Sequence, residues 1–263
     1  MKPRSLLLIF AWLAAGPALA ACPRIVSQSP YLTAALEWLG QGKCIVGVSR
    51  YDKHDLPKTG GVIDPDADVL AILQPDLLVT ADWAKPETLA QRLPDGTRGL
   101  RLGGFGSIAE SEAVLHTLAV VSGMSGADAQ VRRFRREWQA AAKAVGGKGE
   151  KVLVLSACSG SPYAFGRQHY IGDAFVKAGF NVVDRAARVR HLRQGEEIAD
   201  IPALVARFKP DIVFSLSHES SIACNAALAT VKVRIVSLKG ENFFHPGPSL
   251  PKGYRELAAG LKS

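Results

Sequence analysis

The sequence predicts an α/β protein with two similar lobes, each built on a parallel sheet, joined by one long rigid α-helix, with a ligand cleft between the lobes. Short apolar runs alternate with amphipathic helical patterns along the chain, which is typical of parallel sheets. One long helical pattern lies near the middle of the chain, and the segments on either side of it repeat each other.

The first 21 residues have the order of a secretory signal peptide. Lys2 and Arg4 form a basic start, residues 6–15 form an apolar run, and residues 18–20 (Ala-Leu-Ala) form a small-residue cleavage site. The run is too short for an ordinary membrane span, and no later segment reaches the roughly 18 apolar residues that a span needs. We therefore expect an exported, periplasmic protein.

The four cysteines favour two disulfides, because an even count in an exported chain indicates pairing. Three pairings are open, and the simplest places one bridge in each lobe, Cys22 with Cys44 and Cys158 with Cys224. Residues 19–22 (Leu-Ala-Ala-Cys) also match a lipobox, in which Cys22 would carry a lipid anchor. That alternative leaves an odd thiol, so simple cleavage is favoured.

Each lobe is expected to contain four strands. In the N-terminal lobe (22–125) we expect strands at 24–27, 44–49, 76–80 and 98–102, and helices at 31–39, 67–73 and 108–121. In the C-terminal lobe (148–263) we expect strands at 151–156, 181–184, 211–215 and 234–237, and helices at 171–177, 201–208 and 254–261.

The connecting helix is predicted over residues 126–147. Apolar residues such as Val131, Phe134 and Trp138 recur at helical spacing, and Gly146 and Gly147 end the pattern.

The internal repeat is clearest at two proline positions. Residues 70–79 and 204–213 both read as a helix, then Pro-Asp, then a buried strand. Proline cannot continue the helix, so Pro75 and Pro210 separate one element from the next.

Composition and charge exclude several classes. Hydrophobic residues make up 48% and charged residues 21%, which is globular composition. The net charge is +8, or +6 without Lys2 and Arg4. In an exported protein this favours an anionic ligand or a solvated basic face over nucleic acid.

Aromatic and basic residues follow the predicted strands, where ligands bind in open α/β sheets. Rings provide stacking surfaces for large planar ligands, and guanidinium groups bind carboxylates and ferric chelates. The candidate ligand-binding residues are Arg50, Tyr51, Trp83, Phe105, Tyr163, Phe165, Arg167, His191, His218 and Phe243.

Enzyme motifs are incomplete in this chain. Residues 158–161 (Cys-Ser-Gly-Ser) lack the glycines of a nucleophile elbow, and residues 103–106 lack the dinucleotide-binding spacing. We therefore expect no enzyme and no intrinsic cofactor, and the sequence does not identify metal ligands. The alternative is an exported enzyme or metal-centre assembly protein that uses Cys158 as a thiol with His218.

Several short motifs follow one another in a fixed order along the whole mature chain. They are residues 24–30 (Arg-Ile-Val-Ser-Gln-Ser-Pro), 45–49 (Ile-Val-Gly-Val-Ser), 59–61 (Thr-Gly-Gly), the two Pro-Asp repeats, and 244–248 (Phe-His-Pro-Gly-Pro). With the central helix, they resemble the periplasmic substrate-binding proteins of ABC importers that carry vitamin B12, ferric siderophores or haem.

The resemblance implies a monomer that delivers a metal chelate to a membrane permease. It implies docking through one acidic residue per lobe, and Asp68, seven residues before Pro75, stands at the N-lobe position. The chain departs from the family in the C-lobe, where Ala203 stands at the equivalent position before Pro210, and Asp200, or Glu196 and Glu197, are the candidates to substitute. A charge complementing a helix N-terminus also explains Asp68.

The resemblance also bears on the ligand. Tyr51 matches a cobalamin-contacting tyrosine of the B12-binding members, whereas Val62 stands near the place of one of their tryptophans. A corrinoid is favoured, with haem or a ferric siderophore as the alternative.

Overall fold

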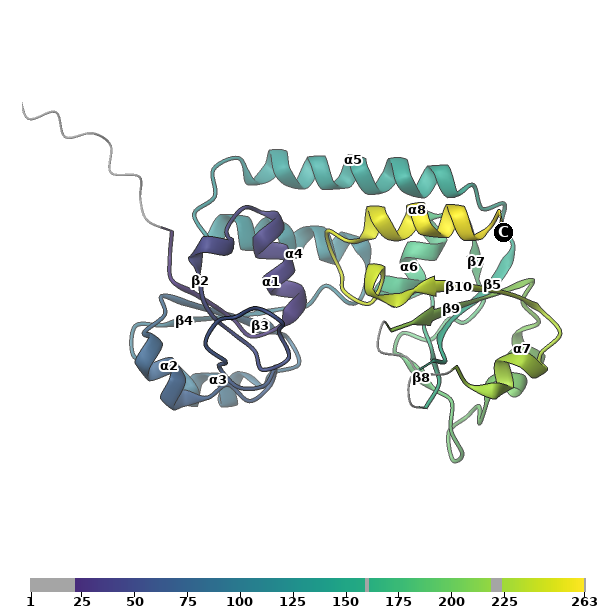
Figure 1. The fold of residues 1–263 in the computed structure, drawn as a ribbon, viewed down its shortest axis with the longest axis horizontal. Coiled ribbons are helices and arrows are strands. Elements are labelled where there is room, and N and C mark those ends of the chain that lie inside the picture. Colours follow the sequence, from purple (N-terminus) through teal and green to yellow (C-terminus); the bar gives the residue numbers. More distant parts are fainter. Residues whose placement is uncertain (1–21, 159–160, 219–223, 263) are drawn as a thin grey trace, which may run out of the picture.

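A computed structural model describes residues 22–158, 161–218 and 224–262. The expected signal peptide and cleavage site lie outside the described residues. Figure 1 shows two α/β lobes side by side, with α5 (Ala127–Val145) lying across both of them. Within the described ranges, no helix has the length and apolar character needed to cross a membrane.

The N-lobe sheet is four-stranded and entirely parallel. Its order is β2-β1-β3-β4. The strands are β1 (Ile25–Ser27), β2 (Ile45–Val48), β3 (Leu77–Ala81) and β4 (Arg98–Leu102). The accompanying helices are α1 (Pro30–Trp38), α2 (Ala67–Leu73), α3 (Pro86–Arg92) and α4 (Ile108–Val121).

The C-lobe sheet is mixed. Four strands run parallel to one another: β5 (Lys151–Ser156), β7 (Asn181–Val182), β9 (Ile212–Ser217) and β10 (Arg234–Lys239). The short strands β6 (Tyr163–Ala164) and β8 (Arg190–His191) add an antiparallel edge. The helices are α6 (Tyr170–Lys177), α7 (Ile201–Phe208) and α8 (Leu250–Gly260).

The two lobes repeat each other at the helix–Pro–Asp–strand unit. Gln74 ends α2 and Lys209 ends α7, both in the left-handed conformation, with φ of 44° and 47°. In the next turn, the Asp76 carboxylate accepts a hydrogen bond from the Arg24 backbone nitrogen at 2.7 Å. Asp211 accepts the equivalent bond from Lys151 at 2.8 Å. The repeat predicted from the sequence is therefore also a repeat of hydrogen bonds.

The connecting helix α5 is held on the N-lobe by a buried carboxylate. Glu112 of α4 accepts hydrogen bonds from the Arg135 guanidinium and, at 2.8 Å, from the Trp138 indole nitrogen. At the other end α8 packs alongside α5 over the C-lobe (Figure 1). One continuous hydrophobic core contains residues of both lobes, so the lobes are packed together as well as linked.

All four cysteines form disulfides, Cys22 with Cys44 and Cys158 with Cys224. The pairing of one bridge per lobe is therefore confirmed. The enzyme alternative needs a free Cys158 thiol, and in this structure Cys158 is bonded to Cys224.

Candidate functional site: the cleft between the lobes

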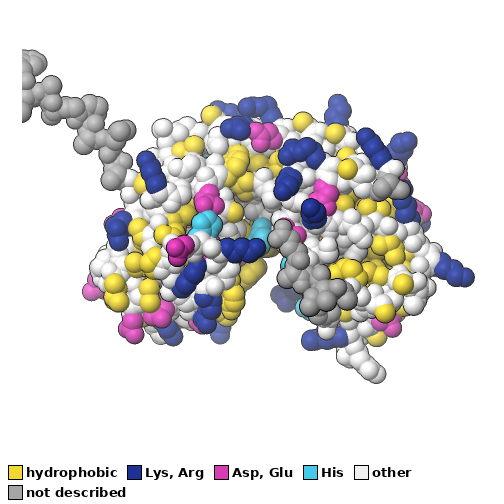
Figure 2. Space-filling model, viewed as in Figure 1, with side chains coloured by type: hydrophobic (Ala, Val, Ile, Leu, Met, Phe, Trp, Pro, Cys, Tyr) yellow, Lys and Arg dark blue, Asp and Glu magenta, His cyan; other side chains and the backbone are white. Residues whose placement is uncertain are grey.

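The two lobes enclose a cleft on the side of the molecule away from α5. Figure 2 shows this hollow in the same view as Figure 1, with hydrophobic, histidine and basic side chains along its edge. The ring of Phe105, which follows β4 in the N-lobe, lies near the ring of His169 in the C-lobe.

A set of aromatic contacts begins on the N-lobe wall. Phe105 lies three residues after the end of β4. Its ring centroid is 5.1 Å from that of Tyr31 and 4.9 Å from that of Trp83. The Tyr31 hydroxyl lies 2.7 Å from the Leu102 carbonyl oxygen, which fixes the ring under Phe105. The centroid of His169, the residue before α6, is 6.4 Å from that of Phe105 and thus links the wall to the other lobe.

The same set of contacts continues on the C-lobe. Phe165 lies 5.1 Å from His169 and 5.3 Å from Tyr163 between ring centroids. Phe244, which follows β10, is 6.3 Å from Phe165 and stacks on His218 at 4.2 Å. We call these rings, from Tyr31 and Trp83 to Tyr163, Phe244 and His218, the ring row. It runs without interruption from one lobe to the other.

Two aromatic side chains of the N-lobe are mainly exposed. Trp83 is 56% and Tyr51 66% exposed, although exposed aromatic surface is unfavourable in water. They follow β3 and β2, which are separated by β1 in the sheet order. Two strand spacings place these chain positions about 10 Å apart.

Backbone hydrogen bonds fix the junction of the lobes at the ring row. The Tyr170 backbone nitrogen donates to the Phe105 carbonyl oxygen at 2.7 Å. The Ile108 nitrogen at the start of α4 donates to the Asp173 carboxylate of α6 at 3.0 Å. These two hydrogen bonds join the lobes at this place.

His169 contributes a neutral ring to this junction. Burial lowers its pKa to about 4. Its Nδ1 accepts a hydrogen bond from the Ile171 backbone nitrogen at 3.2 Å, so the proton lies on Nε2. The ring therefore packs between Phe105 and Phe165 as an apolar surface with one donor.

Most of the arginines near the cleft already have acidic or amide partners. Arg50 pairs with Asp64 at 2.7 Å. Arg190 is held by the buried Asp184 at 2.8 Å and by Glu197 at 2.6 Å. The Arg167 guanidinium donates to Asn181, at the start of β7, at 3.1 Å.

The structure brings six of the predicted ligand-binding residues into or against the ring row. These are Trp83, Phe105, Tyr163, Phe165, His191 and His218, with His191 placed 6.2 Å from the ring of Tyr163. Arg50 and Tyr51 lie on the loop after β2, where the Arg50 guanidinium sits 5.9 Å from the Tyr51 ring.

Three predicted residues do not face the cleft, and one of them, Phe165, is only 4% exposed and belongs to the hydrophobic core. Phe243 is fully buried and packs on Phe175 in the C-lobe core, while its neighbour Phe244 takes the position in the ring row. Arg167 is directed to the amino end of β7. Tyr31 also belongs to the row, and nothing in the sequence separates it from the other apolar positions of its helix.

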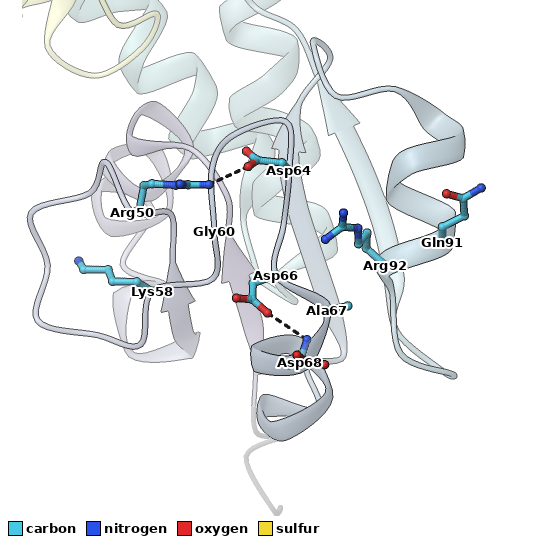
Figure 3. Close-up of a pocket in the computed structure, with 9 residues that line it drawn as sticks. All are labelled: Arg50, Lys58, Gly60, Asp64, Asp66, Ala67, Asp68, Gln91 and Arg92. Atoms are coloured by element: carbon cyan, nitrogen blue, oxygen red, sulfur yellow. Dashed lines mark hydrogen bonds and ion pairs between the residues drawn. The ribbon is translucent and has the colours of Figure 1, made fainter.

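A separate cavity of about 730 Å³ lies on the N-lobe. Figure 3 shows that it is lined by the segment between β2 and α2 and by α3, with Arg50 and Asp64 pointing toward each other. Asp66 caps α2 by accepting from the Asp68 nitrogen at 3.0 Å, and Asp68 is exposed. Asp200 caps α7 in the same way, accepting from Ala203 at 2.8 Å. Among the described residues, no group of three or more His, Cys, Asp and Glu side chains is arranged to hold a metal ion.

Comparison with known proteins finds no matching family model and no matching curated protein. Solved structures do match. Over 92% of this chain and 97% of the other, the vitamin B12-binding protein BtuF of Vibrio cholerae aligns with a TM-score of 0.72 and 15% identity. A periplasmic haem-binding protein of Pseudomonas aeruginosa aligns with a TM-score of 0.67 and 24% sequence identity, over 90% of this chain and 92% of the other.

An ABC transporter substrate-binding protein of Listeria monocytogenes gives a TM-score of 0.65 with 18% identity, over 90% of this chain and 98% of the other. These likenesses establish the fold: the chain has the fold of the substrate-binding proteins of ABC importers. The resemblance predicted from the sequence is confirmed at that level.

Proposed function

We propose that this chain is an exported substrate-binding protein that captures a large planar metal chelate in the cleft and delivers it to an ABC import permease. The ring row carries this proposal, because its members that are not buried, Trp83 and Phe105 on the N-lobe and Tyr163, His218 and Phe244 on the C-lobe, offer stacking surface from both lobes. Tyr31 and Phe165 are buried and support these rings from the core. The exposed Trp83 and Tyr51 extend that surface on the N-lobe wall. The protein binds and releases its ligand without turning it over.

A corrinoid is the ligand that this cleft favours. Arg50 and Arg190 are paired with Asp64 and Asp184, so their charges are already compensated. Cobalamin carries neutral amide side chains around its macrocycle and needs stacking and hydrogen bonds more than free cations. The match of Tyr51 to a cobalamin-contacting tyrosine points to the same ligand.

Haem or a ferric siderophore is the second candidate. Arg185 and Arg188 are exposed beside His191, and Arg188 and His191 line a cavity of about 470 Å³ on the C-lobe. A carboxylate-bearing chelate would bind there through guanidinium groups.

Permease docking is assigned to Asp68 and Asp200. Both are exposed, and each lies at the amino end of a helix, α2 in the N-lobe and α7 in the C-lobe. Figure 1 places α2 and α7 at the ends of the lobes remote from α5. A permease that contacts both lobes at these ends would face the mouth of the cleft.

Calorimetric titration of the chain without residues 1–21 tests the ligand. One-site binding of cyanocobalamin at micromolar affinity or tighter supports the corrinoid proposal. Binding of haemin in its place supports the second candidate. Failure of both probes, or turnover that a thiol reagent blocks, contradicts the proposed function.

A further inference from the structure

The loop that carries Arg50 and Tyr51 is fastened to the N-lobe at both ends. The Arg50 nitrogen donates to the Gly60 carbonyl oxygen at 2.7 Å, and the Asp52 nitrogen donates to Ser49 at 3.1 Å. At the far end of the loop, the Lys58 ammonium bonds the carbonyl oxygens of Asp52 and His54 at 2.9 and 2.5 Å. These bonds shape the loop but leave its tip to be held by side chains.

His54 is the side chain that fastens the tip to another element. Its Nε2 lies 2.7 Å from a carboxylate oxygen of Glu37 in α1, and its Nδ1 makes a short hydrogen bond with the carboxylate of Asp52. An ionised carboxylate can accept hydrogen bonds but cannot donate them, so both nitrogens of the His54 ring must carry a proton. The geometry therefore requires a positively charged imidazolium between two carboxylates.

Because the Asp52 carboxylate is buried, its hydrogen bond to His54 matters for the stability of the loop. Its side chain is only 3% exposed, and one of its oxygens has no partner among the described residues. A buried carboxylate without its cation is costly, so the loop depends on the ring.

The two carboxylates beside His54, those of Asp52 and Glu37, both raise its pKa. Hydrogen bonding to Asp52, and then to Glu37, raises its pKa above the ordinary value, against the opposing effect of burial. Burial alone would raise the pKa of Asp52, but hydrogen bonds from His54 outweigh it and the pKa is lowered. The Lys58 ammonium donates a hydrogen bond to the backbone carbonyl oxygen of His54 and not to its ring. The sequence neighbours Lys53 and Asp55 are exposed.

We propose that His54, held between Asp52 and Glu37, is a positioning residue that fastens the Tyr51 loop to α1 and makes ligand capture dependent on pH. This rests on the proposed function, because it treats Tyr51 as part of the ligand wall. Loss of one proton leaves the ring with a single donor. The buried Asp52 keeps that donor, and the lone pair on Nε2 then faces the Glu37 carboxylate and opens the contact to α1.

The sign of the pH effect follows from the raised pKa. The fastening is complete below the ordinary histidine pKa of about 6.5 and is lost as the pH rises through the higher pKa of the folded protein. Glu37→Gln changes this behaviour, because an amide can donate to a neutral Nε2 or accept from a protonated one. The loop should then stay fastened at both extremes.

The first test uses the protein without ligand. NMR titration of the histidine ring protons should show His54 titrating above its ordinary pKa, and amide relaxation over residues 50–58 should show the loop gaining mobility through that titration. In Glu37→Gln the mobility should no longer follow pH. His116→Gln, which removes an exposed pair with Asp128, should change neither readout. A His54 pKa at or below its ordinary value, or a loop insensitive to its titration, overturns the proposal.

The second test measures cyanocobalamin and haemin affinity at about pH 6 and about pH 9, on either side of the titration. Wild-type affinity should fall by about twofold to tenfold, the effect of losing one hydrogen bond, and the affinity of Glu37→Gln should stay constant. Constant wild-type affinity alongside a loosened loop overturns the positioning role. If neither probe binds at either pH, the proposed function fails, and the NMR result alone then decides whether His54 fastens the loop.

Discussion

The backbone nitrogen of Tyr170, the first residue of α6, donates a 2.7 Å hydrogen bond to the carbonyl oxygen of Phe105, the ring that follows β4. This bond joins the two lobes at the base of the cleft. With the bond from Ile108 to Asp173 and the helix α5 across both lobes, it restricts closure. Under the proposed function, we expect ligand capture to depend on side chains already in place.

Acidification should weaken this junction through His169. Burial lowers its pKa to about 4, so between about pH 6.5 and about pH 4 the unfolded chain binds a proton that the folded chain does not. Stability should fall as the pH falls through that interval. His169→Asn keeps a helix-capping side chain without the titration, and its denaturation midpoint should fall less. An equal fall in both proteins would contradict the role of His169.

Removal of the Glu112 carboxylate should loosen α5 from α4. Its side chain is 9% exposed, and in Glu112→Ala the Trp138 indole nitrogen loses its partner. We expect a loss of about 1–3 kcal/mol in the free energy of unfolding, measured by urea denaturation. The control is Glu137→Ala, which breaks an exposed pair with Arg133 and should cost about 0.3–0.5 kcal/mol. Equal losses would show that Glu112 has no special role.

Glycine at the left-handed helix ends should stabilise the protein. Lys209 adopts φ of 47°, a conformation that favours glycine over residues with a Cβ. Lys209→Gly should raise the free energy of unfolding by about 0.5–1 kcal/mol. Lys252→Gly, within helix α8, should lower it by about 1 kcal/mol. The same sign in both variants would be incompatible with the left-handed assignment.

The disulfide that closes the longer loop of chain should contribute more to the free energy of unfolding than the one that closes the shorter loop. Cys158 and Cys224 are separated by 66 residues, and Cys22 and Cys44 by 22. On the chain-entropy view, replacing the first pair by serine should cost about 4 kcal/mol and the second about 3 kcal/mol. Thermal unfolding of the two double-serine variants provides the comparison. A reactive thiol in the unreduced wild type would instead revive the enzyme alternative.

Truncation of Tyr51 should weaken ligand binding if its ring stacks on the chelate. Tyr51→Ala should cost about 1–3 kcal/mol in binding free energy, measured by calorimetry with cyanocobalamin or haemin. Ile72→Ala removes a side chain that is 82% exposed on α2 and should leave affinity unchanged. Unchanged affinity in Tyr51→Ala would remove this residue from the site.

The fold was largely predictable because its signals are local. The bounds of α2, α4 and α7 match the predicted helices, and α5 lies within the predicted range 126–147, since helical spacing, glycine and proline mark the ends of these helices. Strands β6 and β8 were not predicted, because two-residue strands have no periodicity and exist only through pairing with each other and with β5.

The candidate site was less predictable, because it depends on the direction in which each side chain points as well as on the position of the residue in the chain. Strand ends placed Phe105, Phe165 and His218 among the candidates, but could not tell that Phe165 and Phe243 are buried in the core while Phe244 is partly exposed. The His54 contact to Glu37 joins residues 17 apart in the sequence and depends on the path of the loop over α1.

The central claim is that one ligand contacts ring residues of both lobes. Calorimetric titration of cyanocobalamin and haemin into wild type, Trp83→Ala and Phe244→Ala tests it, because Trp83 belongs to the N-lobe and Phe244 to the C-lobe. The account predicts one site per chain for one of the two probes, and a loss of about 1–3 kcal/mol in each variant. Binding that neither variant weakens, or that only one weakens, would contradict capture between the lobes.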